Sequence, residues 1–233
     1  MAGGEEKGNM MDKFSRLAVA VLLTCLLLGF PRPQSALAYN AADGFAIADF
    51  ATGFADTYGG NGPIGLAFDS SNNLFVMDTA DGNLYEFGPA GGTATTPVNV
   101  APIDNSPAGI AFGKDGRLYL ARQSTNDVVE LDPSTGAIIR TVATDISCAT
   151  GIATDPLSGD LFVSGGGCAS VVRISNFANG PGTVTTYASP GNTDGLTFAP
   201  DGTLYAALFG SSVIKIAGTN TSTPGAVTLL RVG

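Results

Sequence analysis

The candidate functional side chains of this sequence are mainly carboxylates and amides, and its 233 residues include no histidine. Mechanisms that depend on imidazole, such as a Ser-His-Asp triad or a histidine-ligated zinc ion, are therefore excluded. Carboxylate and amide oxygens that converge are hard ligands suited to Ca²⁺ or Mg²⁺. The polar turn residues that we expect on one face of the fold are Asn61, Asp78, Asp104, Asn105, Arg122, Asp127 and Asp194.

The apolar segments that must position these residues repeat along the chain. A segment led by glycine recurs at steps of 44, 42 and 44 residues, and two further apolar runs follow each glycine on the same spacing. In the third run, charged residues hold one register, which predicts strands with one buried and one wet face. The turns between the first two runs are rich in Gly, Asn and Asp, which tolerate positive φ. The leading glycines are Gly65, Gly109, Gly151 and Gly195, and the charged residues are Glu86, Glu130, Arg173 and Lys215.

A fourth, less regular run closes each unit, at residues 96–100, 137–142, 183–187 and 226–232. Four antiparallel strands per repeat of this length predict a β-propeller blade. One more outer strand, at residues 45–50, precedes the first unit. The predicted fold class is therefore all-β, a propeller of four full blades plus one extra N-terminal strand, with residues 39–60 as a lead-in and residues 61–233 as the blades.

Three stretches of the first unit carry a resemblance to known proteins: GPIGLAFD at residues 62–69, NLFVMD at 73–78 and NLYEF at 83–87. They resemble the NHL-repeat proteins and the related SMP-30/gluconolactonase group, and the resemblance extends over about residues 62–232. It implies a six-bladed TolB-like propeller, which at this repeat length needs roughly 260 residues. The expected ring is therefore incomplete. A truncated product, a four-bladed ring with a spare strand, and a ring completed by another chain are the alternatives.

The resemblance also implies a divalent metal, held in the gluconolactonase group by a Glu, two Asn and an Asp. Only Asp194, in Asp194-Gly195-Leu196, matches this pattern; Asn61 stands at the Glu position, and Ala108 and Thr150 stand at the Asn positions. The metal prediction is thus limited to Asp194, with help from Asp104 and Asn61, and Ca²⁺ or another divalent cation is the only cofactor considered. The alternative is that Asp194 is a turn residue that accepts backbone hydrogen bonds.

In a blade of up-and-down strands, the loop before the innermost strand and the loop joining the second and third strands emerge on the same face. This geometry is the reason for expecting the polar residues above on one face. It also brings Cys148 and Cys168 to that face within one blade, which predicts a disulfide closing a loop of about twenty residues and stabilising the fold by roughly 3 kcal/mol. Two free thiols are the alternative.

The first 38 residues are predicted to be a signal peptide. An apolar run of 14 residues, 17–30, is shorter than the roughly 20 that a membrane-spanning helix needs. It leads to Ser35-Ala36-Leu37-Ala38, where small side chains favour cleavage after Ala38. The mature chain is expected to be exported, to the periplasm or the extracellular space, with no membrane span after cleavage; an uncleaved anchor is the alternative.

The formal net charge of −9 disfavours a nucleic-acid partner, which requires a basic surface. The first functional hypothesis is an exported binding or scaffold module that presents the loops of one face to a protein, a glycan or a small molecule. The second is a cation-dependent lactonase or related hydrolase of the gluconolactonase type, which the missing ligands disfavour. The third is an inactive fragment of a larger propeller.

Overall fold

The computed structural model describes residues 43–54, 62–165, 169–209 and 212–230. The predicted signal peptide, Asn61 and Cys168 lie outside these residues. Asp49–Gly233 forms one compact unit. The described residues contain strands and no α-helix, and accordingly no helix among them is long and apolar enough to span a bilayer.

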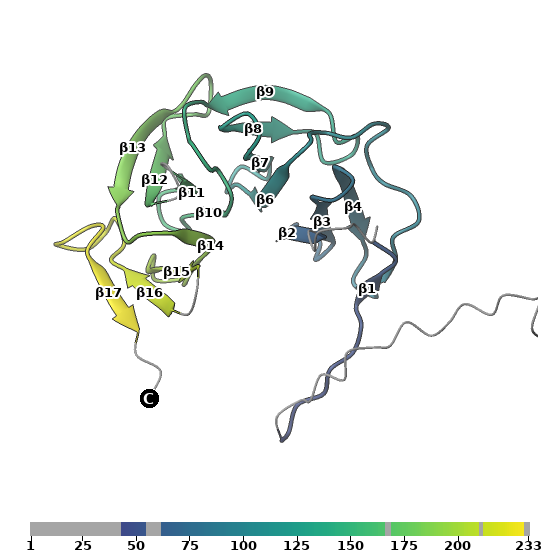
Figure 1. The fold of residues 1–233 in the computed structure, drawn as a ribbon, viewed down its shortest axis with the longest axis horizontal. Coiled ribbons are helices and arrows are strands. Elements are labelled where there is room, and N and C mark those ends of the chain that lie inside the picture. The colour runs from purple at the N-terminus through teal and green to yellow at the C-terminus, as the bar shows by residue number, and fades with distance from the viewer. Residues whose placement is uncertain (1–42, 55–61, 166–168, 210–211, 231–233) are drawn as a thin grey trace, which may run out of the picture. The chain divides into compact units, whose positions relative to one another are not determined.

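Four antiparallel sheets follow one another along the chain, one for each predicted repeat, and within each sheet strands that are consecutive in sequence pair. They lie around an arc with β2, β6, β10 and β14 innermost (Figure 1). The all-β propeller is confirmed, whereas a total of six blades stays a prediction. Blade 1 consists of β2 (Pro63–Phe68), β3 (Leu74–Asp78) and β4 (Asn83–Phe87), and blade 2 of β6 (Pro107–Phe112), β7 (Leu118–Arg122), β8 (Asp127–Leu131) and β9 (Ile138–Ala143). Blade 3 consists of β10 (Ile152–Thr154), β11 (Leu161–Gly165), β12 (Ser170–Ser175) and β13 (Thr183–Ala188), and blade 4 of β14 (Thr193–Phe198), β15 (Leu204–Leu208), β16 (Ser212–Ile216) and β17 (Val227–Leu230).

The outer strand of blade 1 differs from the prediction. Residues 96–100 are irregular, and residues 45–50 form no strand. Instead, β1 (Ala51–Thr52) pairs in parallel with β5 (Gly92–Thr93). Pro97 lacks an N–H to donate to a ladder, and beside it the amide oxygen of Asn99 accepts from the main-chain N–H of Leu84 at 2.8 Å. Blade 1 is therefore a three-stranded sheet and not a full blade. At its outer edge, the side chain of Asn99 bonds β4 where a fourth strand would pair.

The turns between the first and second strands adopt the backbone conformation that their residue types predict. Each contains one residue with φ between 63° and 82°. An L-residue other than Asn or Asp meets a steric penalty there, whereas glycine does not. These residues are Asn72, Gly116, Gly159 and Gly202.

The glycines that lead the repeats are explained by crowding around the arc's centre. A Cβ added to Gly65 would lie 2.5 Å from the carbonyl oxygen of Ala108 in the next blade, and one added to Gly109 would lie 2.6 Å from that of Thr150. At Gly151 the corresponding atom is the carbonyl oxygen of Asp194, at 2.1 Å. Each inner strand thus approaches the next so closely that only glycine fits.

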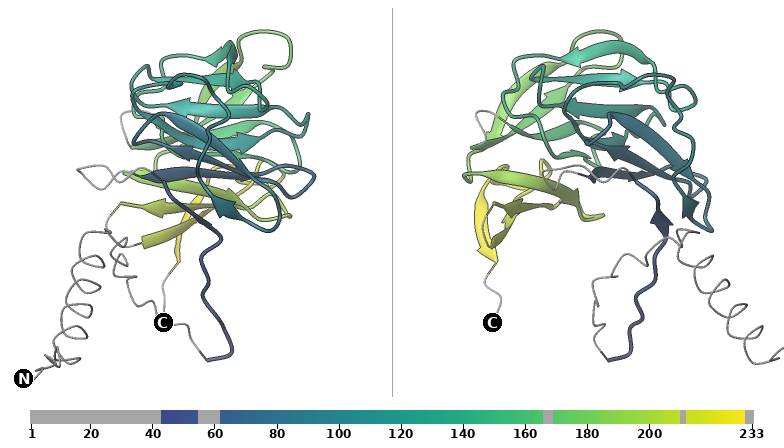
Figure 2. Two further views of the ribbon diagram at one scale, coloured as in Figure 1. Left: turned by 90° about the vertical axis from the view of Figure 1, so that its right-hand side faces the viewer. Right: turned by 45° about the vertical axis from the view of Figure 1, so that its right-hand side comes forward.

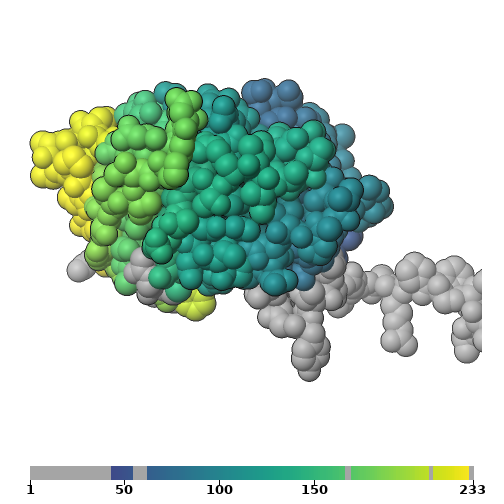
Figure 3. All heavy atoms as spheres, turned by 90° about the horizontal axis from the view of Figure 1, so that it is seen from above, coloured from purple at the N-terminus to yellow at the C-terminus, as the bar shows by residue number. Residues whose placement is uncertain are grey.

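In blade 2 the third strand, β8, is buried on both faces, so the expectation of one wet face is wrong for this blade. Glu86 and Lys215 are exposed, but Glu130 is buried. Its carboxylate accepts from Arg117 at 3.2 Å and from Arg140 at 2.7 Å. Blade 2 lies between blades 1 and 3, as the views in Figures 2 and 3 show, and a charge in such an interface needs partners.

Candidate functional site

Three of the residues predicted on the loop face form an ion-pair cluster in blade 2. The guanidinium of Arg122 donates to both carboxylate oxygens of Asp127, at 2.9 and 2.5 Å. Its Nε also lies 3.7 Å from the carboxylate of Asp104, which accepts from the hydroxyl of Ser124 at 2.5 Å. These three groups are largely buried and paired with one another, so the cluster joins loops, although Oδ2 of Asp104 accepts no hydrogen bond.

The other predicted residues are more scattered. Asp78 is fully buried at the end of β3, where its carboxylate accepts from the main-chain N–H of Ala80 at 3.0 Å. Asn105 is exposed beside Asp104. Asn61 and Cys168 lie outside the described residues, so the disulfide between Cys148 and Cys168 and the contribution of Asn61 stay predictions.

Asp194 and Cys148 are brought together at a cavity of about 220 Å³ formed by loops of three blades. Blade 2 contributes the residue that follows β7, blade 3 the loop before β10, and blade 4 both the start of β14 and the residue that follows β15. Both loop positions are those predicted to share a face. The lining residues are Gln123, Cys148, Thr150, Asn192, Thr193, Asp194 and Phe209. We call this cavity the loop pocket.

Main-chain and hydroxyl hydrogen bonds fix the wall of the loop pocket at residues 192–194. The N–H of Phe209 donates to the carbonyl oxygen of Asn192 at 2.8 Å. The hydroxyl of Ser164 donates to the carbonyl oxygen of Asp194 at 2.6 Å and accepts from the N–H of Gly151 at 2.7 Å. Because Ser164 is fully buried, this wall is held from behind by the neighbouring blade, as a preorganised site requires.

The residues present do not fit the divalent metal that the resemblance implies. Among the described residues, Asp194 is the only carboxylate that lines the loop pocket, and they contain no group of three potential His, Cys, Asp or Glu ligands. Asp104, the predicted helper, is instead engaged with Ser124 and Arg122. Ca²⁺ takes six to eight oxygen ligands and favours carboxylates, so a site with a single carboxylate is poorly suited to bind it.

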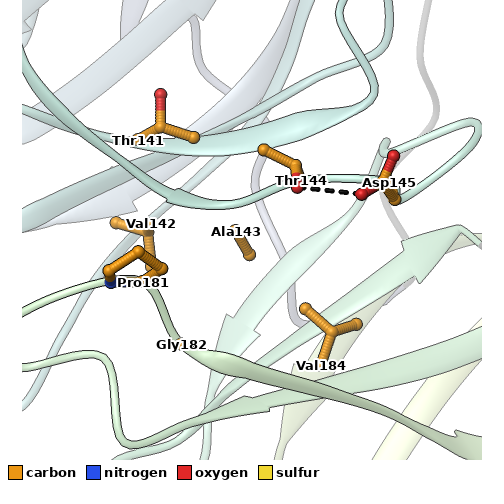
Figure 4. A pocket seen from close by; sticks show the side chains of 8 residues that line it. All are labelled: Thr141, Val142, Ala143, Thr144, Asp145, Pro181, Gly182 and Val184. Carbon is orange, nitrogen blue, oxygen red and sulfur yellow. Dashed lines mark hydrogen bonds between the residues drawn. The ribbon is translucent and has the colours of Figure 1, made fainter.

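A larger groove of about 500 Å³ lies at the rim of the arc, between β9 and β13. Figure 4 shows residues 141–145 on one side and Pro181, Gly182 and Val184 on the other, with the hydroxyl of Thr144 donating to Asp145 at 3.0 Å. Its side chains are mostly small and apolar, and apart from Asp145 none carries a charge. The rim groove therefore has fewer polar side chains that could bind a ligand specifically than the loop pocket has.

Sequence reasoning did not single out Gln123 and Phe209. Each is the first residue after the second strand of its blade, following β7 and β15. The strand pattern places that position on the loop face, but nothing in residue type alone marks Phe209 as a surface residue. Its ring is 77% exposed.

The fold is similar to several solved propellers at low sequence identity. Virginiamycin B lyase from Staphylococcus aureus is 15% identical with a TM-score of 0.52, over 74% of this chain and 56% of that one. A putative gluconolactonase is 21% identical with a TM-score of 0.55, over 66% and 59%. A chain of a nidogen/laminin complex is 21% identical with a TM-score of 0.60, over 73% and 65%.

This chain thus spans less than two thirds of each of these structures. No protein-family model and no curated protein matches the sequence. At such identities the similarity establishes the propeller fold, consistent with the NHL and SMP-30/gluconolactonase resemblance, and does not transfer activity.

Proposed function

We propose that this chain is a binding module and that the loop pocket is where it holds a glycan, a small molecule or an exposed group of a partner protein. The observation that carries the proposal is the convergence of loops from three blades on one cavity whose wall is hydrogen-bonded to the blade behind it. Ligand sites in repeat folds lie where loops from several repeats meet, with few polar groups at fixed positions.

The test is a ligand screen observed residue by residue. Isotope-labelled mature chain is titrated with a library of mono- and disaccharides, amino acids and amines, and amide chemical shifts are followed. Binding at the loop pocket moves the signals of Gln123, Thr150 and Asn192 together. Asn105→Ala, on the same face but outside the pocket, leaves these shifts intact. Shifts confined to the rim groove, or none with any compound, would contradict the proposal.

Hydrolysis with a bound cation is the competing function, because one of the similar structures is described as a putative gluconolactonase. A thermal-shift titration with Ca²⁺, Mg²⁺, Zn²⁺ and Mn²⁺ separates the two. A binding module with one pocket carboxylate shows no change in melting temperature. A rise of several degrees that Asp194→Ala abolishes would favour the hydrolase instead. If neither this titration nor the ligand screen gives a response, the third hypothesis, an inactive fragment, is favoured.

We also propose that the mature chain begins at Tyr39 and works outside the cytoplasm. The 14-residue apolar run and the small residues before Tyr39 support cleavage, and two cysteines remain in the exported chain, as expected for an oxidising compartment. Expression with the leader should yield exported protein whose first residue is Tyr39. Reduction should raise its mass by two hydrogens, and recovery of the full-length chain in the membrane fraction would indicate an uncleaved anchor.

A further inference from the structure

We propose that the ligand of the loop pocket is a small hydroxylated amine, such as an amino sugar, whose ammonium group lies between the carboxylate of Asp194 and the ring of Phe209. This inference rests on the proposed function and adds the chemical class of the ligand. The loop pocket combines one uncompensated negative charge, one exposed aromatic ring and several neutral hydrogen-bonding groups.

The carboxylate of Asp194 lacks a cationic partner within the described residues. It is exposed, and no side chain there pairs with it. The described arginines are all engaged by other carboxylates: Arg117 and Arg140 by Glu130, Arg122 by Asp127, and Arg173 by Asp160. Arg122, which directly precedes Gln123 of the pocket, is held by two acidic residues. None of the described arginines is therefore available to Asp194, and its carboxylate is open to a cationic group of a ligand.

The ring of Phe209 is the second feature that points to a cation. The main-chain bond from Phe209 to Asn192 fixes the backbone of this residue beside the wall that contains Asp194. A largely exposed aromatic ring attracts an ammonium group through its quadrupole, by about 0.5–1 kcal/mol at a solvent-exposed site. A carboxylate and an aromatic ring together favour an ammonium over a neutral group of the same size.

The remaining lining argues for a polar skeleton on that ammonium. Gln123, Thr150 and Asn192 present amide and hydroxyl groups that both donate and accept hydrogen bonds. The lining that the structure describes contains no lysine or arginine, and the chain carries a net charge of −9, which disfavours an anionic ligand. A cavity of about 220 Å³ is smaller than the roughly 300–1,000 Å³ of sites for drug-sized ligands and suits a single ring.

The experiment compares two sugars that differ at one nitrogen. Glucosamine carries an ammonium group, whereas N-acetylglucosamine is neutral and keeps the hydroxyls. The mature chain is titrated with each by NMR at low ionic strength, near neutral pH. We expect glucosamine to bind about fivefold more tightly, which corresponds to the strength of one exposed cation contact. Added salt should shrink this preference, because exposed charges are screened.

Variants assign the preference to the proposed groups. Asp194→Asn keeps the shape and should reduce the preference for glucosamine to about twofold, the share left to the ring of Phe209, while leaving N-acetylglucosamine affinity within about twofold. Phe209→Leu should reduce the preference about two- to threefold. Asp145→Asn, at the rim groove, makes the same change in net charge and should alter neither affinity.

Three results would overturn the inference. The first is equal affinity for the two sugars. The second is an equal loss of the preference for glucosamine in Asp145→Asn and Asp194→Asn. The third is no binding of glucosamine. If the first result is accompanied by chemical-shift changes at the loop pocket, the proposed binding function is retained and only the proposal of an ammonium-bearing ligand is rejected. Absence of shifts at the pocket across the whole library would reject both.

Discussion

At the residue scale, Ser164 shows how one buried hydroxyl can link two blades. It contacts Gly151 within blade 3 and the carbonyl oxygen of Asp194 in blade 4, and it lies 2.9 Å from the hydroxyl of Thr150. Thr150 and Asp194 both line the loop pocket. Because its hydroxyl is fully buried and bonded to the main chain of both blades, Ser164 is a positioning residue.

Ser164→Ala should lower the free energy of unfolding by about 1–3 kcal/mol, because buried partners lose a hydrogen bond that nothing replaces. The same variant should broaden or shift the amide signals of residues 192–194. Urea unfolding followed by circular dichroism measures the first effect and NMR the second. Ser147→Ala, at an exposed position in the same blade, is the control. Equal stability of both variants would show that the hydroxyl does not hold the wall.

Tyr119 makes the stability of the fold sensitive to alkaline pH. Burial raises the pKa of its phenol well above 10, and the hydrogen bond to Asp115 and the charge of that residue raise it further. Since the folded-state pKa is above the unfolded one, the stabilisation is fully present below about pH 10 and is lost as pH rises through the folded-state pKa.

Tyr119→Phe should therefore reduce the loss of stability between pH 10 and 11.5, while costing about 1 kcal/mol at pH 7 through the missing hydrogen bond. Unfolding by urea at several pH values provides the measurement. Thr186→Val, an exposed substitution that removes no titrating group, should keep the alkaline slope of the wild type. An identical slope in wild type and Tyr119→Phe would disprove the assignment.

At the element scale, the outer edge of blade 1 depends on a side chain where other blades have a strand. Asn99 accepts from the N–H of Leu84 and donates to the side chain of Asn83 and the carbonyl oxygen of Ala101, at 2.8, 2.9 and 2.6 Å. The main-chain N–H of Val98 adds a bond to the carbonyl oxygen of Leu84 at 2.7 Å. In blades 2 and 3, the outer strands β9 and β13 pair with the third strands β8 and β12 through main-chain ladders. In blade 1, the side chain of Asn99 takes this role at the edge of β4.

Asn99→Ala should destabilise the chain by about 1–3 kcal/mol, since it leaves the N–H of Leu84 buried without a partner. Amide hydrogen exchange should accelerate in β4 before it does in β8 or β12, because the loss is local to blade 1. Asn105→Ala, an exposed asparagine in a nearby loop, should change neither. Uniformly faster exchange in all blades would mean that the edge and the core unfold together.

At the scale of the whole molecule, the two end blades present faces that the inner blades bury. Gly195 has nothing within 4 Å of an added Cβ, although its equivalents Gly65, Gly109 and Gly151 are crowded. Val213 is 45% exposed, whereas Val171, at the same position of blade 3, is fully buried. On blade 1, Leu66 and Phe68 of β2 are 62% and 60% exposed. Contiguous apolar faces of this kind promote association.

The chain should therefore self-associate as its concentration rises, and the double variant Leu66→Ser with Phe68→Ser should associate less. Since both side chains are largely in water, unfolding free energy should change by no more than about 1 kcal/mol. Sedimentation velocity over a range of concentrations tests this. Ile139→Ser, which removes an exposed apolar side chain from the outer strand β9, should leave association as in wild type. Unchanged association in the double variant would place the contact elsewhere.

The sequence by itself determined the repeat, the strands of blades 2 to 4, the three inner strands of blade 1 and the turns. Hydrophobic alternation and residues that tolerate positive φ depend only on a few neighbouring residues, so they can be read locally. The sequence also placed Asp194 and Cys148 on a shared face, since strand order decides on which side a loop emerges. It failed at residues 45–50 and 96–100, where short apolar runs resemble strands but Pro97 and the packing of a blade edge prevent a ladder.

Only the tertiary structure decided which groups are free to act. The burial of Glu130 with its two arginines and the pairing of Arg122 with Asp104 and Asp127 join residues that are 5 to 18 positions apart and lie on different strands or loops. The loop pocket likewise depends on how each blade packs against the next, and this packing cannot be read from a local sequence pattern. Contacts between distant segments are set by packing, and packing leaves Asp194 and Phe209 facing solvent together.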